Sequence, residues 1–83
     1  MKISLLPQAQ EDLCDITDPI LSKILKRIHA LRRYPELGAA MVGPFAGYRS
    51  TVVDPFRIVY KQAAHDLLLV AYIRHCRRNP PQA

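Results

Sequence analysis

At 83 residues the chain predicts one domain, spanning residues 1–83. Its composition, 49% hydrophobic and 23% charged residues, is ordinary for a globular protein. No apolar run approaches the roughly 18 residues of a membrane span, and the N-terminus lacks the apolar core of a signal peptide. The net charge of +5 favours an anionic partner such as nucleic acid, an anionic membrane or an acidic protein.

The cysteines predict neither a disulfide scaffold nor a metal site. Cys14 and Cys76 are the only two, and they are not spaced as paired metal ligands. With no export signal, we expect a reducing, cytoplasmic environment. Cys14 lies beside apolar positions and is expected to be a small core residue, and Cys76 is not expected to be a catalytic thiol.

The N-terminal quarter predicts a short strand followed by a short helix. Residues 2–6 are apolar enough for an edge strand, and Pro7 suits the first turn of a helix because its missing N–H has no partner there. Over residues 7–16, three apolar side chains fall at i, i+4 and i+7, on one helical face. They are Ala9, Leu13 and Ile16.

A second, longer helix is predicted from residue 20 to residue 33. Asp18 is expected to be its N-cap and Pro19 its first helical residue. Tyr34 precedes a proline and should end the helix. One apolar stripe follows the helical period and should face the core. The stripe comprises Ile20, Leu21, Ile24, Leu25, Ile28 and Leu31.

The second half of the chain predicts a loop and then three strands. Residues 35–47 are rich in turn formers and should form a loop whose apolar side chains, Met41, Val42 and Phe45, pack onto the domain. Strands are expected at residues 48–53, 56–61 and 67–74 because of their β-branched and aromatic character. A tight turn at Asp54-Pro55 is expected to connect the first two of these strands.

Together these elements predict an α+β fold. It has an N-terminal β-strand, a two-helix hairpin, and a three-stranded antiparallel meander packed against the helices. Residues 67–73 are apolar on both parities, which is typical of a strand buried on both sides and therefore central in its sheet.

The sequence shows no motif for a cofactor, a metal ion or a nucleophile elbow, and we predict none of the three. What remains is a set of basic residues at the ends of the predicted strands. They are Arg49, Arg57, Arg74, His75, Arg77 and Arg78.

These basic residues suit two kinds of chemistry. Arginine can hold a phosphate at two points, and histidine can exchange a proton near neutral pH. Together they could cleave RNA without a metal, with arginines stabilising the charged phosphorane. They could equally bind an acidic protein surface and catalyse nothing. A shared site requires Arg57 and His75 to face the same side of the sheet, and strand alternation places Arg74 and His75 on opposite sides if the strand is regular.

Three segments resemble the RelE/ParE-like toxins of type II toxin–antitoxin systems. Residues 4–16 (SLLPQAQEDLCDI) match a strand leading into a helix with the pattern A-x-x-D-L-x-x-I. Residues 47–60 (GYRSTVVDPFRIVY) resemble the family's middle hairpin, and residues 71–80 (AYIRHCRRNP) its last strand with a terminal basic cluster. The resemblance covers nearly the whole chain.

The resemblance implies a small cytoplasmic toxin that inhibits growth and is neutralised by a cognate antitoxin. It implies no membrane partner, and contact with operator DNA would come through the antitoxin. ParE-like members poison DNA gyrase, whereas RelE-like members are endoribonucleases that cut mRNA on the ribosome. The chain lacks the lysine-rich first helix and the terminal aromatic residue of some nuclease members. Its G-x-R, FRIVY and HCRR patterns resemble the ParE side slightly more.

The resemblance also implies roles for the basic residues under each mechanism. In a nuclease, His75, Arg57 and Arg77 would be catalytic. In either case, five arginines would contact the target or its phosphates: Arg49, Arg57, Arg74, Arg77 and Arg78. A third alternative is an inactive relative that only binds its antitoxin and operator DNA.

Overall fold

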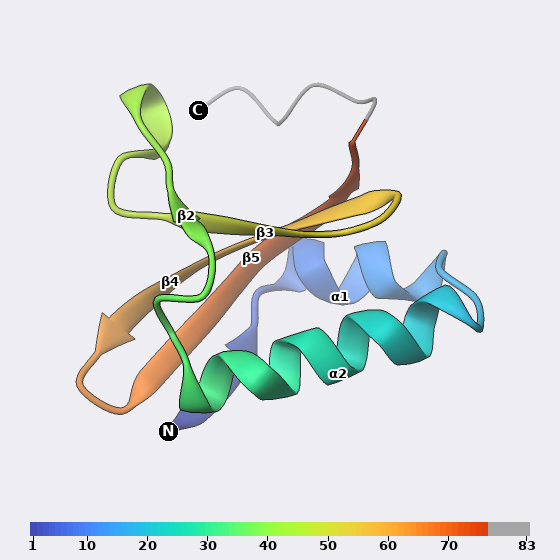
Figure 1. Cartoon of the computed structure of the whole chain (residues 1–83), viewed down its shortest axis with the longest axis horizontal. Coiled ribbons are helices and arrows are strands. Elements are labelled where there is room, and N and C mark those ends of the chain that lie inside the picture. The colour runs from blue at the N-terminus through green and yellow to red at the C-terminus, as the bar shows by residue number, and fades with distance from the viewer. Residues whose placement is uncertain (77–83) are drawn as a thin grey trace.

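The computed structural model describes residues 1–76 and has two layers, a five-stranded sheet and a pair of helices on one of its faces (Figure 1). The predicted α+β architecture is therefore confirmed. In chain order the elements are β1 (Lys2–Leu5), α1 (Pro7–Cys14), α2 (Ile20–Arg33), β2 (Ala39–Ala40), the 3-10 helix η1 (Gly43–Phe45), β3 (Arg49–Val53), β4 (Phe56–Ala64) and β5 (Leu67–His75).

The strand order is β1-β5-β4-β3-β2. Strands β3, β4 and β5 form the predicted antiparallel meander, and the short β2 pairs antiparallel with β3. β1 pairs in parallel with β5, so β5 has a neighbour on each side, as its unbroken apolar character predicted. β1 lies at the edge of the sheet, also as predicted.

The hydrophobic core lies between the sheet and the helices. From α2 it takes Ile24, Ile28 and Leu31, which follow the 3.6-residue period of a helix. Leu25 was expected on the same stripe, but it is 47% exposed, so the prediction that it belongs to the core is wrong. It lies one position round the helix from Ile24, at the margin of the covered face. Cys14 is also exposed, at the last residue of α1, so its expected place in the core is wrong too.

Hydrogen bonds join each helix to the sheet, and another lies in the segment that connects the two helices. Asp12 of α1 accepts a hydrogen bond from the Ile73 backbone N–H of β5 at 2.8 Å. Arg27 of α2 donates to Thr51 Oγ1 of β3 at 2.6 Å. The helix α2 has the predicted span, but its N-cap is Pro19, so the expected N-cap role of Asp18 and helical position of Pro19 are wrong by one residue. The Asp18 carboxylate nevertheless accepts from the Ser22 backbone N–H at 3.0 Å near the helix start.

Residues 34–48, which we call the strap, leave the end of α2 and carry the chain round the sheet to the face that the helices leave uncovered (Figure 1). The predicted loop here contains β2 and η1. Phe45 and Met41 are partly buried as expected, whereas Val42 is 84% exposed and the expectation that it packs down is wrong. Val42 directly precedes η1, as its N-cap residue.

An irregularity in β5 decides which of its side chains face the helices. The pairing with β4 runs Ile58↔Ile73 and Val59↔Tyr72, then shifts to Tyr60↔Val70, so that Ala71 has no partner of its own. Such a bulge changes the parity of a strand. Before it, even-numbered residues enter the core, and after it Ile73 does. The bulge therefore allows Ile73 to share the core with Leu68 and Val70.

Within residues 1–76, neither helix has the length and apolar character needed to cross a bilayer.

Candidate target-binding face

The face of the sheet opposite the helices, which we call the outer face, gathers two of the predicted arginines. Arg57 of β4 pairs directly with Arg74 of β5, and the neighbouring pair on the same face is Val59 with Tyr72. Directly paired residues of antiparallel strands share a face, so both arginines flank Tyr72. The bulge at Ala71 places Tyr72 and Arg74 on this face.

Aromatic rings and cations alternate across the outer face. The Arg74 guanidinium lies 5.9 Å from the centroid of the Tyr72 ring, within the range of a cation–π contact. Phe45 of η1 meets Tyr72 edge-on with ring centroids 6.1 Å apart, and meets Tyr48 in the same way at 6.3 Å. Lys61 Nζ lies 5.1 Å from the centroid of the Tyr48 ring. The resulting surface offers both flat apolar rings and positive charge.

Two buried polar atoms on the outer face have no hydrogen-bond partner among the described residues. They are the Tyr72 hydroxyl and Arg74 Nε. Burial raises the pKa of the Tyr72 phenol above its ordinary 10.0, against the opposing charges of Arg74 and Arg57. The phenol therefore keeps its proton at neutral pH and remains a hydrogen-bond donor. Two unsatisfied donors side by side suit an oxyanion or a carbonyl oxygen of a ligand.

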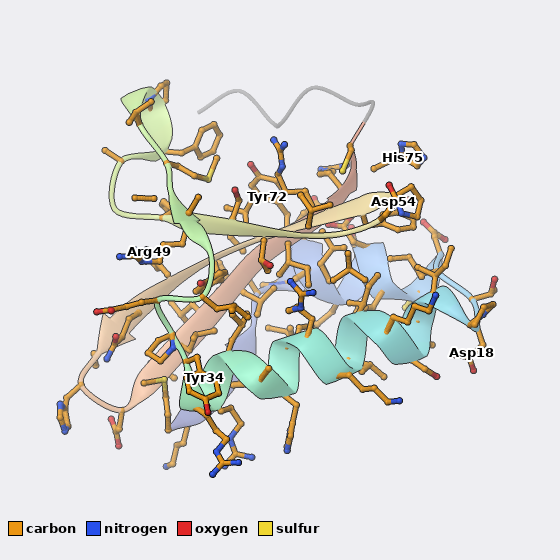
Figure 2. All side chains as sticks on the ribbon, in the orientation of Figure 1. Asp18, Tyr34, Arg49, Asp54, Tyr72 and His75 are labelled. Carbon is orange, nitrogen blue, oxygen red and sulfur yellow. The ribbon has the colours of Figure 1, made fainter. Side chains whose placement is uncertain are left out.

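His75 does not join this group. It pairs with Phe56, whose side chain packs against the core, and the two rings meet edge-on at 5.6 Å between centroids. Together with Asp12 of α1, Asp15 just after that helix and the neighbouring Arg74, it lines a pocket of about 350 Å³. In Figure 2 His75 lies at one end of the sheet near Asp54, and Tyr72 lies over its middle. Arg57 and His75 thus face opposite sides, and the condition for a shared site is not met.

Arg49 also lies away from the outer arginines. It pairs with Tyr60, whose side chain is in the core, so Arg49 points to the helix-facing side of β3. Its guanidinium donates to the Gly38 carbonyl oxygen at 2.8 Å. Arg77 and Arg78 lie outside the described residues. Of the five arginines predicted to contact the target, the structure therefore places Arg57 and Arg74 together.

Sequence reasoning missed Phe45 as a member of this face and assigned no site role to Tyr72. Strand alternation places Arg57 on the opposite face from Phe56 and Ile58. It cannot assign the side chains of β5 to faces, because the bulge interrupts the alternation of that strand. The sequence feature of β5 that set it apart from the other strands was its apolar run on both parities. Among residues 1–76 no group of His, Cys, Asp or Glu side chains is arranged to hold a metal ion.

Comparison with known proteins agrees with this fold. A chain of the toxin–antitoxin complex RelBE2 from Mycobacterium tuberculosis superposes with a TM-score of 0.80 at 21% identity, covering 88% of this chain and 94% of that chain. The intact RelBE complex of E. coli gives 0.76 at 11% identity, covering 92% and 96%. The YoeB–YefM complex of Staphylococcus aureus gives 0.72 at 20% identity, covering 90% and 95%.

No curated protein sequence is significantly similar to the chain. A family model, however, matches residues 3–80, and its description is the ParE toxin of the type II toxin–antitoxin system parDE. The match spans all three segments that carry the resemblance and every element of the structure except the N-terminal residue of β1. The chain therefore belongs to the ParE toxin family.

Proposed function

We propose that this toxin inhibits growth by poisoning DNA gyrase, and that the outer face is its contact surface. The observation that carries the proposal is that His75 faces the helix side of the sheet, whereas Arg57 and Arg74 pair with each other on the outer face. A nuclease that relied on His75 for proton transfer would need it beside the arginines that hold the phosphate. A binding surface has no such requirement.

The groups that do lie beside the arginines favour binding. Tyr72 is held protonated and Arg57 and Arg74 are permanently charged, so this part of the outer face offers donors and rings but no side chain that exchanges a proton near pH 7. Aromatic and arginine side chains are the residue types that contribute most to protein interfaces. The match to the ParE family model supports the same choice.

A second candidate function is cleavage of mRNA on the ribosome. The observation that favours it is the pair of unsatisfied donors, the Tyr72 hydroxyl and Arg74 Nε, because a phosphate oxygen would satisfy both. Under this alternative the arginines would stabilise a phosphorane, and the proton transfers would need residues other than His75.

A cognate antitoxin is the expected partner, as the similar folds found in toxin–antitoxin complexes support. Neutralisation by an acidic antitoxin segment would fit the net charge of +5. Contact with operator DNA would then come through the antitoxin.

The test is induction of the chain without its antitoxin, with RNA 5′ ends and gyrase-dependent DNA breaks measured in the same culture. We expect DNA breaks with intact messages. Arg74→Ala should weaken inhibition of purified gyrase by about 2 kcal/mol, roughly thirtyfold in affinity, as for a central arginine of an interface. Lys23→Ala removes one exposed cation of α2 and is the matched control, with no change expected.

Mapping of RNA 5′ ends separates the two mechanisms, and His75→Ala tests whether His75 has a chemical role in either. Under the gyrase proposal it should lower toxicity only in proportion to any loss of folded protein. New RNA ends within translated codons, absent from cells expressing Arg57→Ala or Arg74→Ala, would replace the gyrase proposal with the nuclease. Unchanged growth with folded protein would indicate an inactive relative.

A further inference from the structure

The strap is anchored at its beginning by a hydroxyl buried under the sheet. Tyr60 of β4 is 1% exposed, and its phenol oxygen donates to the Pro35 carbonyl oxygen at 2.8 Å. The same oxygen accepts from the Gly38 backbone N–H, also at 2.8 Å. One side chain thus satisfies two backbone groups of the strap, three residues apart, on the helix-facing side of the sheet.

Gly38 packs so closely against β3 and Tyr60 that no side chain fits at this position. A Cβ at this position would lie 2.7 Å from the Ser50 carbonyl oxygen and 2.8 Å from the Tyr60 hydroxyl, nearer than real Cβ atoms approach other atoms. The Gly38 carbonyl oxygen also accepts from Arg49 at 2.8 Å. Tyr60, Arg49 and β3 therefore hold this part of the strap from three directions.

Beyond Gly38 the strap has few attachments to the rest of the described chain. β2 is two residues long, and the hydrogen bond from the Met41 backbone N–H to the Tyr48 carbonyl oxygen, 2.9 Å in length, joins two residues of the strap itself. Gly43 and Gly47, which flank the segment carrying Phe45, have φ angles of 70° and 96°, in the region that glycine favours. The position of Phe45 against Tyr72 therefore depends on how the strap is fixed at its start.

We propose that Tyr60 is a positioning residue for the outer face: its buried hydroxyl fixes the strap and thereby sets Phe45 against Tyr72. Tyr60 touches no target itself, because its side chain lies on the opposite side of the sheet. The inference rests on the proposed function only in taking the outer face as the contact surface.

The physical reason lies in what remains when the hydroxyl is removed. Tyr60→Phe keeps the ring in the core but leaves the Pro35 carbonyl and the Gly38 N–H without a partner in a buried place. Unsatisfied buried backbone groups are costly, and these two can reach water only if the strap moves away from the sheet. Such a movement separates Phe45 from Tyr72.

The experiment compares Tyr60→Phe with Tyr34→Phe, which deletes a hydroxyl from a tyrosine of the same strap that is 62% exposed. The Phe45–Tyr72 nuclear Overhauser effect and the NMR titration of the Tyr72 phenol report the outer face directly. In Tyr60→Phe we expect the Overhauser effect to be lost and the pKa of Tyr72 to fall toward its ordinary value of about 10, as water reaches the phenol. Tyr34→Phe should change neither.

Target inhibition is then measured at equal concentrations of folded protein, determined by urea unfolding. We expect a loss of roughly tenfold or more in Tyr60→Phe, since small displacements in a binding constellation have effects of this size. If Tyr60→Phe does not fold, Arg49→Ala, which removes the other side-chain bond to Gly38, should give the same changes to a smaller degree.

An unchanged Overhauser effect and an unchanged Tyr72 titration in a folded Tyr60→Phe variant would overturn the inference and leave Tyr60 a structural residue. So would a change at Tyr72 without any change in target inhibition. Because the NMR measurements need no target, failure of the gyrase proposal alone would leave the Phe45–Tyr72 result intact.

Discussion

Tyr72 combines two properties that are seldom found in one side chain: burial and an unsatisfied hydroxyl. Leaving such a group unpaired costs free energy in the free protein, and a ligand atom that accepts its hydrogen bond recovers that cost on binding. Arg74 Nε is in the same situation beside it. At the scale of single residues, the outer face is therefore prepared for binding at some cost to folding.

This view predicts the pH dependence of a Tyr72→Phe variant. Because burial raises the pKa of Tyr72 in the folded state, stability is full below the ordinary pKa of about 10 and falls as the pH rises, since the unfolded chain ionises first. Tyr72→Phe should be as stable as the parent or about 1 kcal/mol more stable near neutrality. It should also lose less stability than the parent between about pH 8 and about pH 11, on either side of the ordinary tyrosine pKa.

Urea unfolding at the two pH values measures both effects, and Tyr34→Phe controls for the loss of an exposed phenol. Equal alkaline losses in the parent and in Tyr72→Phe would mean that the folded environment of Tyr72 does not disfavour its ionisation.

At the scale of elements, the sequence predicts the positions of the helices and major strands because each has a periodic pattern or a punctuating proline. The end of α2 before Pro35 and the start of β4 after Pro55 follow from chain chemistry alone. β2 could not be predicted, because two alanines carry no pattern and their pairing with β3 depends on where Tyr60 and Arg49 hold the strap. Leu25 shows that an apolar stripe can be wider than the surface that covers it.

The exposure of Leu25 gives a test of the helix packing. Ile24 is fully buried and Leu25 is its neighbour in the chain. Ile24→Ala should lower the free energy of unfolding by about 2–5 kcal/mol, because it leaves a cavity against the sheet. Leu25→Ala should lower it by less than about 1 kcal/mol, as is usual for a side chain that remains in contact with water. Urea denaturation compares the two, and equal losses would contradict the observed orientation of α2.

At the scale of the whole molecule, the sheet joins segments from both ends of the described chain. β5 lies between β1, near the N-terminus, and β4, so its hydrogen bonds depend on the complete fold. The strap, in contrast, is attached to one edge. Stability should therefore decrease across the sheet from β5 toward β2.

Native-state hydrogen exchange measures this gradient. Amides of β4 and β5 should exchange only through global unfolding, and the Met41 amide, which donates to Tyr48 at the end of the strap, should exchange through local opening with a much lower free energy. Added denaturant should accelerate the β5 amides strongly and the Met41 amide weakly. If Met41 were protected as well as β5, the strap would be an integral part of the cooperative unit.

The candidate site was predictable in its residue types but not in its arrangement. The resemblance and the charge pattern indicate Arg57 and Arg74, and both reach the outer face. The same reasoning placed His75 and Arg49 with them, but in the structure both face the helix side of the sheet. Strand pairing decides which face a side chain occupies, and a single sequence does not reveal the pairing. Phe45 lies in a segment without any period, so its contact with Tyr72 follows only from the path of the strap.

The unpaired Ala71 has a consequence for how this protein can change over generations. Replacing Ala71 by another small residue keeps the count of residues on either side, and with it the orientation of everything that follows. Losing Ala71 would remove the extra residue and leave Val70, Tyr72 and Ile73 paired in regular alternation with Tyr60, Val59 and Ile58, so the side chains that follow would keep their faces. The end of β5 should accordingly accept the loss of Ala71 more readily than the loss of Ile73, because Ala71 has no partner in β4 whereas Ile73 pairs with Ile58.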